Sequence, residues 1–141
     1  MYSQPILIVE DDEDDQNLLS SAFEKIGKRE LVRFFKNGHD LLRHLDAMPS
    51  GQHPALVVLD YNMPLLNGGQ TLRRIRAHAT QHAVPAVVFS TGFTSAITKE
   101  LNELQVLACV QKGAAFDKLV QQARYFTELI ADEFETLIGN Y

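Results

Sequence analysis

Five side chains suited to phosphoryl chemistry follow short apolar runs of the chain. Glu10 and Asp11 directly follow one run, Asp60 follows another, and Ser90 and Lys112 follow two more. Phosphoryl transfer needs a nucleophile, neutralisation of the phosphoryl oxygens and alignment of the reacting groups. An aspartate is ionised at neutral pH, so it needs no general base and can become an acyl phosphate. Asp60 is therefore the candidate phosphoacceptor.

The three carboxylates also predict a metal site. Carboxylates held close together repel one another and raise each other's pKa values, a cost that a divalent cation relieves. An oxygen-only ligand set without nearby Cys or His favours a hard ion, and we expect Mg²⁺. Lys112 would then pair with one phosphoryl oxygen and Ser90 would donate a hydrogen bond to another, while Mg²⁺ holds a third.

The elements that must position these groups are visible as apolar patterns. Runs rich in Val, Ile, Leu and Phe that lack period-two alternation predict strands buried on both faces. These runs are residues 5–9, 31–35, 55–59, 85–89 and 106–110. Apolar residues at helical spacing lie between and after them, over residues 18–26, 41–45, 72–79, 95–104 and 115–138.

This alternation of strands and helices predicts an α/β fold. Five strand–helix units give a doubly wound parallel sheet of five strands. Right-handed crossovers limit the possible topologies, and sheets of this size commonly take the order 2-1-3-4-5. In such a sheet the ligand site lies beyond the carboxyl ends of the strands, where the strand order reverses. Glu10 and Asp11 after the first strand should therefore meet Asp60 after the third. We find no internal repeat and no linker, so residues 1–141 are expected to form a single domain.

Composition narrows the class of protein. The chain of 141 residues is 45% hydrophobic, which suits one globular domain. Its net charge of -5 comes from six consecutive acidic residues, 10–15, and a globally basic surface for nucleic acid is excluded. Arg73, Arg74 and Arg76 are interpreted as a solvated helix face. The lone Cys109 excludes an intramolecular disulfide. With no apolar stretch long enough for a signal peptide or a membrane span, we expect a cytoplasmic protein.

The motifs together resemble the receiver domain of two-component response regulators, over nearly the whole chain. The resemblance is carried by Glu10-Asp11 after a strand, residues 60–64 (Asp-Tyr-Asn-Met-Pro) with Gly68, Ser90, and Lys112. It implies a flavodoxin-like (CheY-like) fold. It also implies that Asp60 takes a phosphoryl group from a sensor histidine kinase or a histidine phosphotransfer protein. The chain would then change conformation and signal to a downstream protein target, as a signalling protein rather than an enzyme.

The resemblance also assigns roles around the acceptor aspartate. With it, Asp11 would bind Mg²⁺ directly, Glu10 mostly through water, and Asn62 through its backbone carbonyl. Ser90 corresponds to the hydroxyl that turns toward the phosphoryl group. Thr91 occupies a place where receivers keep a small residue, which leaves the phosphoryl site open.

Three features depart from the receiver pattern. Cys109 stands three positions before Lys112, where receivers usually carry an aromatic residue that swings inward, so a different readout surface is expected. Gly113 follows Lys112 in place of a proline in a cis peptide bond. A non-proline cis bond costs about 3 kcal/mol, so this bond is either trans or strained. Finally, the sequence ends shortly after the last predicted helix, and we expect a stand-alone receiver.

Two other functions stay open at this point. One is a degenerate receiver that never takes phosphate and acts through protein contact alone, which the departures at Cys109 and Gly113 favour. The other is a phosphohydrolase of the haloacid-dehalogenase type. That class needs a second aspartate two residues after the nucleophile as a general acid, and this chain has Asn62 there.

The last predicted helix is long for its sheet. Residues 115–138 would span roughly 36 Å. Phe126, Ile130, Phe134 and Leu137 continue an apolar stripe toward its far end. The stripe either caps the core of the domain or docks on a second subunit, and the second reading predicts a homodimer.

Overall fold

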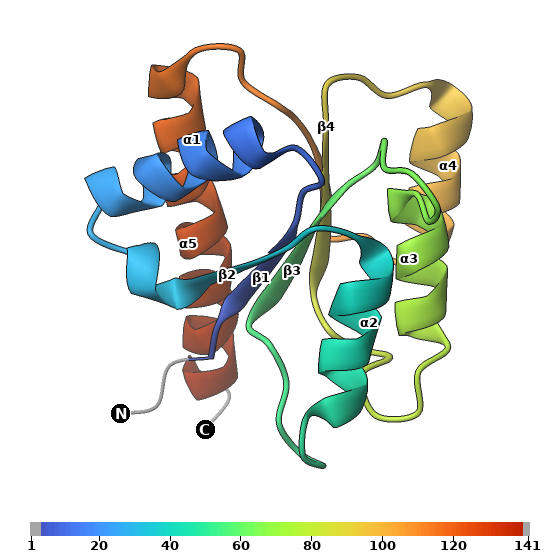
Figure 1. The fold of residues 1–141 in the computed structure, drawn as a ribbon. Helices are drawn as coiled ribbons and strands as arrows, with labels where there is room; N and C mark the ends of the chain where they lie inside the picture. The colour runs from blue at the N-terminus through green and yellow to red at the C-terminus, as the bar shows by residue number, and fades with distance from the viewer. Residues whose placement is uncertain (1–3, 140–141) are drawn as a thin grey trace.

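A five-stranded parallel sheet lies between two layers of helices (Figure 1). The computed structural model describes residues 4–139, with side chains up to Ala131. The strands are β1 (Ile6–Val9), β2 (Val32–Phe35), β3 (Leu56–Asp60), β4 (Ala86–Ser90) and β5 (Ala108–Gln111). The helices are α1 (Glu13–Lys25), α2 (Gly38–Ala47), α3 (Gly68–Arg76), α4 (Ser95–Glu103) and α5 (Phe116–Gly139), with a short 3₁₀ turn at Arg29–Leu31.

The strand order is β2-β1-β3-β4-β5, with all four pairings parallel, which confirms the predicted topology. The direction of winding reverses between β1 and β3. In consequence α1 and α5 cover one face of the sheet, and α2, α3 and α4 cover the other (Figure 1). None of the helices within residues 4–139 combines the length and the apolar character that a bilayer crossing demands.

Each face of the sheet has its own apolar core. On one side Ile8 of β1 packs with Phe23 of α1 and Phe126 of α5, all 1% exposed or less. On the other side Val9 packs in a cluster with Leu72 of α3. Successive side chains of a strand point to opposite faces, so a central strand buried on both faces is apolar at every position. This is the physical reason for the continuous apolar runs of the sequence.

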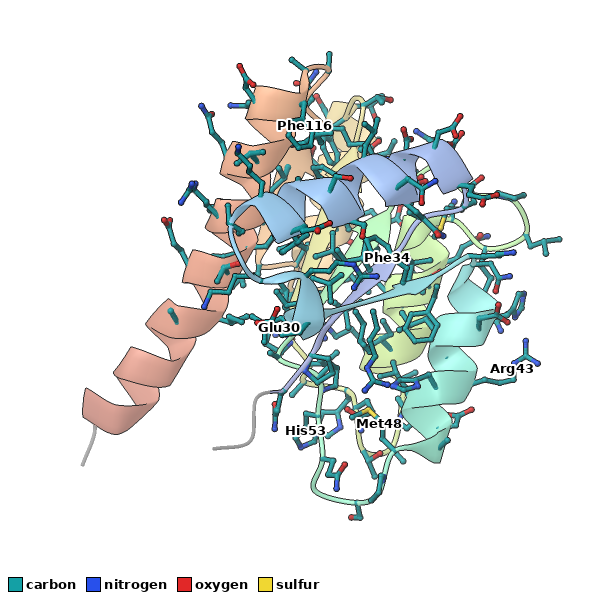
Figure 2. The ribbon with its side chains drawn as sticks, turned by 60° about the vertical axis from the view of Figure 1, so that its left-hand side comes forward. Glu30, Phe34, Arg43, Met48, His53 and Phe116 are labelled. Atoms are coloured by element: carbon teal, nitrogen blue, oxygen red, sulfur yellow. The ribbon has the colours of Figure 1, made fainter. Side chains whose placement is uncertain are left out.

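The edge strands differ from the prediction of strands buried on both faces. β2 begins at a buried Val32, but Arg33 is exposed and Phe34 is half-buried. Figure 2 shows Phe34 beneath α1, and the guanidinium carbon of Arg29 lies 5.5 Å from the centre of its ring. β5 is half-buried along most of its length. An edge strand has a neighbour on one side only, so the flanking helices cover it incompletely.

Two helix predictions also need correction. The third helix ends at Arg76, so Ala79 lies outside it in an exposed loop. At the start of α5, Phe116 is 39% exposed and takes little part in the core (Figure 2). The helix itself runs to Gly139. Phe134 and Leu137, which the predicted apolar stripe includes, lie outside the residues whose side chains are described.

Arg76 is a structural anchor, and its interpretation as part of a solvated face is wrong. Its guanidinium donates hydrogen bonds to the carbonyl of Val84 at 2.6 Å and that of His82 at 3.1 Å, in the loop before β4. It also donates to the carbonyls of Leu104 at 2.8 Å and Gln105 at 3.2 Å, just after α4. The carbonyls at the end of α4 lack partners within the helix, and Arg76 supplies hydrogen bonds to them. Through these bonds and those to the loop before β4, Arg76 connects α3 to both α4 and β4.

We expect Arg76→Ala to lower the free energy of unfolding by about 2 to 3 kcal/mol, because four backbone carbonyls lose a charged donor at once and two of these hydrogen bonds are partly buried. The exposed Arg74 is the matched control, and Arg74→Ala should stay within about 0.5 kcal/mol of the parent chain. Urea denaturation of both variants measures the difference. Equal effects of the two substitutions would contradict the anchoring role.

Candidate functional site

The carboxyl ends of the strands bring together most of the side chains that were singled out in the sequence. Glu10 directly follows β1, Asp60 is the last residue of β3, and Ser90 is the last residue of β4. Lys112 directly follows β5. In a parallel sheet these ends share one edge, so residues far apart in the sequence meet at one site.

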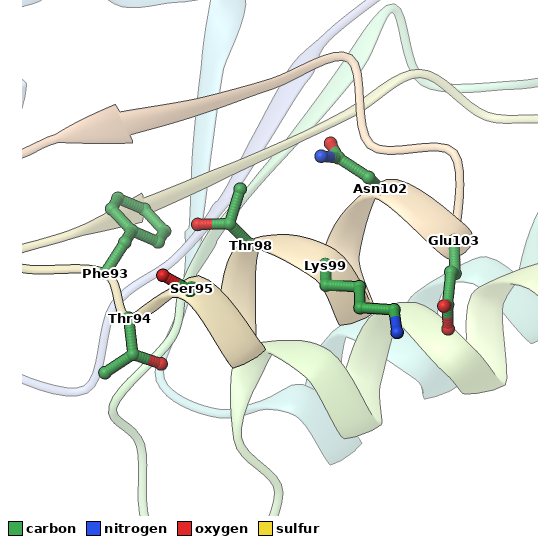
Figure 3. A pocket seen from close by; sticks show the side chains of 7 residues that line it. All are labelled: Phe93, Thr94, Ser95, Thr98, Lys99, Asn102 and Glu103. Atoms are coloured by element: carbon green, nitrogen blue, oxygen red, sulfur yellow. The ribbon is translucent and has the colours of Figure 1, made fainter.

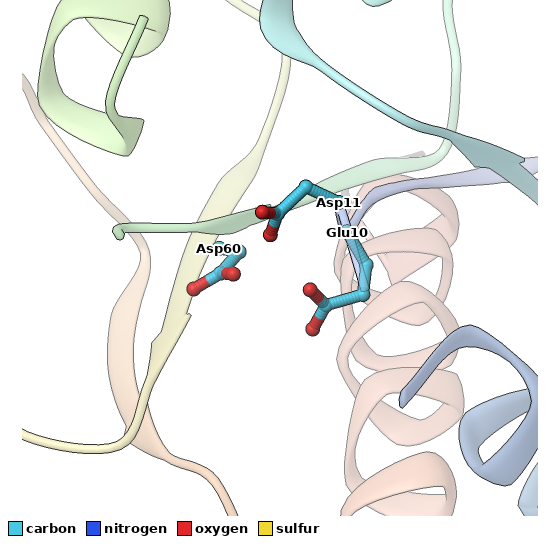
Figure 4. Close-up of side chains that lie close together, drawn as sticks. All are labelled: Glu10, Asp11 and Asp60. Atoms are coloured by element: carbon cyan, nitrogen blue, oxygen red, sulfur yellow. The ribbon is translucent and has the colours of Figure 1, made fainter. Parts of the chain in front are cut away.

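The acidic cluster consists of Glu10, Asp11 and Asp60, and Figure 4 shows their carboxylates turned toward a common point. One oxygen from each of the three lies within 4.8 Å of the others. Glu10 and Asp60 are 4% and 7% exposed, whereas Asp11 is exposed. The cluster is thus open to solvent on one side, as an ion that keeps part of its water shell requires.

Lys112 supplies positive charge inside this cluster. Its Nζ lies 2.5 Å from Oε1 of Glu10, 3.4 Å from Oδ2 of Asp60 and 3.9 Å from Oδ2 of Asp15. The side chain is only 13% exposed. The ammonium therefore lies between the carboxylate that follows β1 and the carboxylate that ends β3.

Burial shapes the electrostatics of the site. It raises the pKa of Glu10 to about 7, and the charge of Asp60 adds to this while Lys112 opposes it. Burial likewise raises the pKa of Asp60 above its ordinary value, against the opposing charge of Lys112. For Lys112 itself burial works to lower the pKa, but the hydrogen bond with Glu10 and the nearby carboxylates outweigh it and the pKa is raised. The positive charge of Lys112 therefore does not fully offset the effect of burial on the pKa values of Glu10 and Asp60.

Ser90, Asn62 and Thr91 form the polar rim of the site. The hydroxyl of Ser90 donates to the carbonyl of Gly92 at 3.1 Å and accepts from Nδ2 of Asn62 at 3.4 Å. The backbone N–H of Asn62 donates to Oδ1 of Asp60 at 3.3 Å. Thr91 is exposed. The Ser90 hydroxyl is thus engaged within its own loop and with Asn62.

The start of α3 packs closely against the backbone of Asp60 and Tyr61. The side chain of Asn67 accepts from the N–H of Gln70 at 2.8 Å, and the side chain of Gln70 accepts from the N–H of Asn67 at 3.0 Å. This capping box fixes where the helix begins. The N–H of Gly68 donates to the carbonyl of Tyr61 at 2.8 Å. A Cβ atom at Gly68 would lie 2.8 Å from the carbonyl oxygen of Asp60, so the close approach needs glycine.

We expect Gly68→Ala to destabilise the fold by about 1 to 3 kcal/mol, because the added methyl group meets backbone that cannot move without displacing Asp60. Gly92→Ala is the matched control, since a Cβ atom there meets open space, and it should change stability by less than about 1 kcal/mol. Thermal unfolding of both variants compares the two. A Gly68→Ala variant as stable as the control would contradict the close packing.

A separate hollow of about 690 Å³ lies against α4. Figure 3 shows its lining side chains along this helix and the loop before it, from Phe93 to Glu103. None of the residues that line it belongs to the acidic cluster.

Residues 6–124 match the family of response regulator receiver domains. The chain belongs to this family. The receiver domain described here is similar to the probable methanogenesis regulatory protein FilR2 of Methanothrix harundinacea, with 27% identity over 81% of this chain and 75% of that protein. Three further curated relatives are longer proteins, of which this chain covers 23 to 38% of the length.

Solved structures show the same fold. The phosphorylated cyanobacterial phytochrome response regulator RcpA superposes with a TM-score of 0.80 at 24% identity, covering 92% of this chain and 95% of that one. The Mn²⁺-bound form of the response regulator Rcp1 superposes with a TM-score of 0.70 at 21% identity, covering 85% and 88%. At these identities the likeness establishes the flavodoxin-like fold of this receiver domain.

The structure also describes both unusual positions of this receiver domain. Cys109 is half-buried in β5, where it lies opposite Val88 of β4. Burial raises the pKa of its thiol, so it is a neutral packing group at neutral pH. Within residues 4–139 no peptide bond is cis, and the bond between Lys112 and Gly113 is therefore trans.

One polar residue beside the site was not predicted from the sequence. Gln122 of α5 is 6% exposed and hydrogen-bonds to the backbone on both sides of Lys112. It lies three residues after Leu119 and four before Phe126, both of which face the core. A polar residue on the apolar stripe of a helix is the signal that identifies it.

Proposed function

We propose that this receiver domain is the phosphoacceptor of a two-component phosphorelay, with Asp60 as the residue that becomes phosphorylated. The proposal rests above all on the position of Asp60 at the end of the central strand β3. Its carboxylate lies 3.4 Å from the Lys112 ammonium and within the acidic cluster. A buried nucleophile that faces both an ammonium and a set of metal-binding carboxylates is equipped for phosphoryl transfer.

In the proposed reaction an oxygen of the Asp60 carboxylate attacks phosphorus in line with the leaving group. A new oxygen–phosphorus bond forms while the bond to the donor breaks, and the donor leaves with the electron pair. The donor would be the phosphohistidine of a sensor histidine kinase or of a histidine phosphotransfer protein. Asp60 attacks in its ionised form, so no general base is needed.

The neighbouring groups take the remaining roles. Lys112 would hold one phosphoryl oxygen through its ammonium, which is already 3.4 Å from Asp60. Ser90 would exchange its hydrogen bond with the carbonyl of Gly92 for one to another phosphoryl oxygen. Thr91, as a small residue, would leave the phosphoryl site open, and Asn62 would offer its backbone carbonyl to a bound metal ion.

Glu10, Asp11 and Asp60 would hold Mg²⁺ together with the Asn62 carbonyl. The donor set fits this ion, because it consists of oxygen atoms only and its three carboxylates converge within 4.8 Å. Bound there, the ion supplies positive charge beside the phosphoryl oxygens. The Mn²⁺-bound form of Rcp1 supports a divalent ion in a protein of this fold.

In the proposal, phosphorylation of Asp60 changes the surface of the protein. The chain thus acts as a signalling protein rather than as a conventional enzyme. Phosphorylation would shift an existing equilibrium between two conformations that a downstream protein partner distinguishes. The acidic net charge of -5 favours protein partners over nucleic acid. We place the protein in the cytoplasm, and a homodimer through the far end of α5 stays a prediction.

We expect acetyl phosphate with Mg²⁺ to add one phosphoryl group to the chain, measured as a mass gain of the intact protein. The gain should be lost in Asp60→Asn, because an amide is no nucleophile at this site. Asp46→Asn is the control, since Asp46 is an exposed carboxylate paired with His78 far from the cluster. A wild-type chain that gains no mass would leave a phosphate-independent interaction module as the better account. A gain that persists in Asp60→Asn would contradict the choice of acceptor.

A further inference from the structure

The side chain of Gln122 in α5 hydrogen-bonds to the backbone of the segment that carries Lys112. Nε2 of Gln122 donates to the carbonyl of Gln111 at 2.6 Å. Oε1 of the same amide accepts from the N–H of Gly113 at 3.0 Å. One glutamine therefore engages the backbone directly before and directly after Lys112.

Together with β4, this amide fixes both peptide planes that flank Lys112. The first plane contains the carbonyl of Gln111, bound by Gln122, and the N–H of Lys112, which donates to the carbonyl of Ser90 at 2.8 Å. The second contains the N–H of Gly113, also bound by Gln122. Peptide groups are planar, so fixing two of them fixes the backbone dihedrals of the residue between them. The direction in which the Lys112 side chain leaves the backbone is thereby set.

The residue after Lys112 makes such a restraint necessary. Gly113 has no side chain to limit its backbone, and β5 ends two residues earlier, at Gln111. A glycine is needed there because α5 passes close by, and an added Cβ atom would lie 2.3 Å from Cγ of Lys118. The permissive residue that allows the close approach also leaves the loop free to move. The Gln122 amide removes this freedom.

Gln122 is an unusual residue for its position in the core. It is 6% exposed on the side of α5 that carries the buried Leu119 and Phe126. An amide buried at such a position is costly unless its donor and acceptor are both used, and an apolar side chain would fill the same space without that cost. Both polar atoms of Gln122 are used, and both are used on the backbone that carries Lys112.

We propose that Gln122 is a positioning residue for phosphoryl transfer, which fixes the backbone of Lys112 so that its ammonium stays between Glu10 and Asp60. The inference rests on the function proposed above, because it concerns the lysine that would hold a phosphoryl oxygen. Gln122 acts through Lys112. Without the Gln122 side chain, the backbone at Lys112 is less restrained and its ammonium moves away from Glu10 and Asp60. A misplaced catalytic group lowers the rate of phosphoryl transfer.

The test compares rates of phosphorylation by acetyl phosphate with Mg²⁺, followed by intact-protein mass. Gln122→Met removes both hydrogen bonds at nearly the same side-chain length, and we expect a rate about tenfold lower. The control is Gln121→Met on the exposed side of the same helix, which should label within about twofold of the wild type. Circular dichroism and thermal unfolding show that each variant is folded at the temperature of the assay.

A second comparison separates positioning from a general effect on the fold. In a Lys112→Met background, Gln122→Met should cause no further slowing, because the group on which it acts is gone. Slowing by the same factor in both backgrounds would overturn the inference, as would a folded Gln122→Met variant that labels as fast as Gln121→Met. In both of these cases the wild type is still labelled and the proposed function stands. A wild type that is never labelled contradicts the proposed function itself.

Discussion

The Lys112 ammonium lies among the carboxylates of Glu10, Asp60 and Asp15, at 2.5, 3.4 and 3.9 Å. Gathering these groups at one edge of the sheet is unfavourable, because burial raises the pKa values of Glu10 and Asp60, and the charge of Asp60 raises that of Glu10 further. The ammonium relieves part of this cost. An excess of negative charge at the site favours binding of a divalent cation. The surrounding elements hold Lys112 and these carboxylates in place.

Several elements of the fold position the acidic cluster and Lys112. β1 is apolar throughout, and β3 is apolar up to Leu59. Both strands are buried between the two helix layers, so Glu10 and Asp60 stand at the ends of buried strands. The capping box before α3 and the close contact of Gly68 fix the backbone at Asp60. On the other side, Gln122 of α5 fixes the backbone at Lys112. The site is therefore linked to helices on both faces of the sheet, through which a change at Asp60 can reach the surface.

Much of this could be predicted from the sequence, because continuous apolar runs indicate buried parallel strands and polar residues at their ends indicate the site. The remainder depends on contacts between distant segments. Arg76 looked like one of three arginines on a solvated face, since nothing local reveals the carbonyls that converge on it. The half-buried edge strands depend on how far helices extend over the sheet. Gln122 offered a local signal as a polar residue on an apolar stripe, but its partners lie in another element.

The charge balance at the strand ends is tested most directly by calorimetric titration of Mg²⁺ into the unphosphorylated protein. We predict that a single Mg²⁺ binds per chain. We also predict that Asp11→Asn, which removes the exposed carboxylate of the cluster while leaving the Lys112 contacts in place, abolishes or greatly weakens this binding. A wild-type protein that binds no Mg²⁺ at millimolar concentration, or an Asp11→Asn variant that binds it as tightly as the wild type, would show that the acidic cluster is not a metal site.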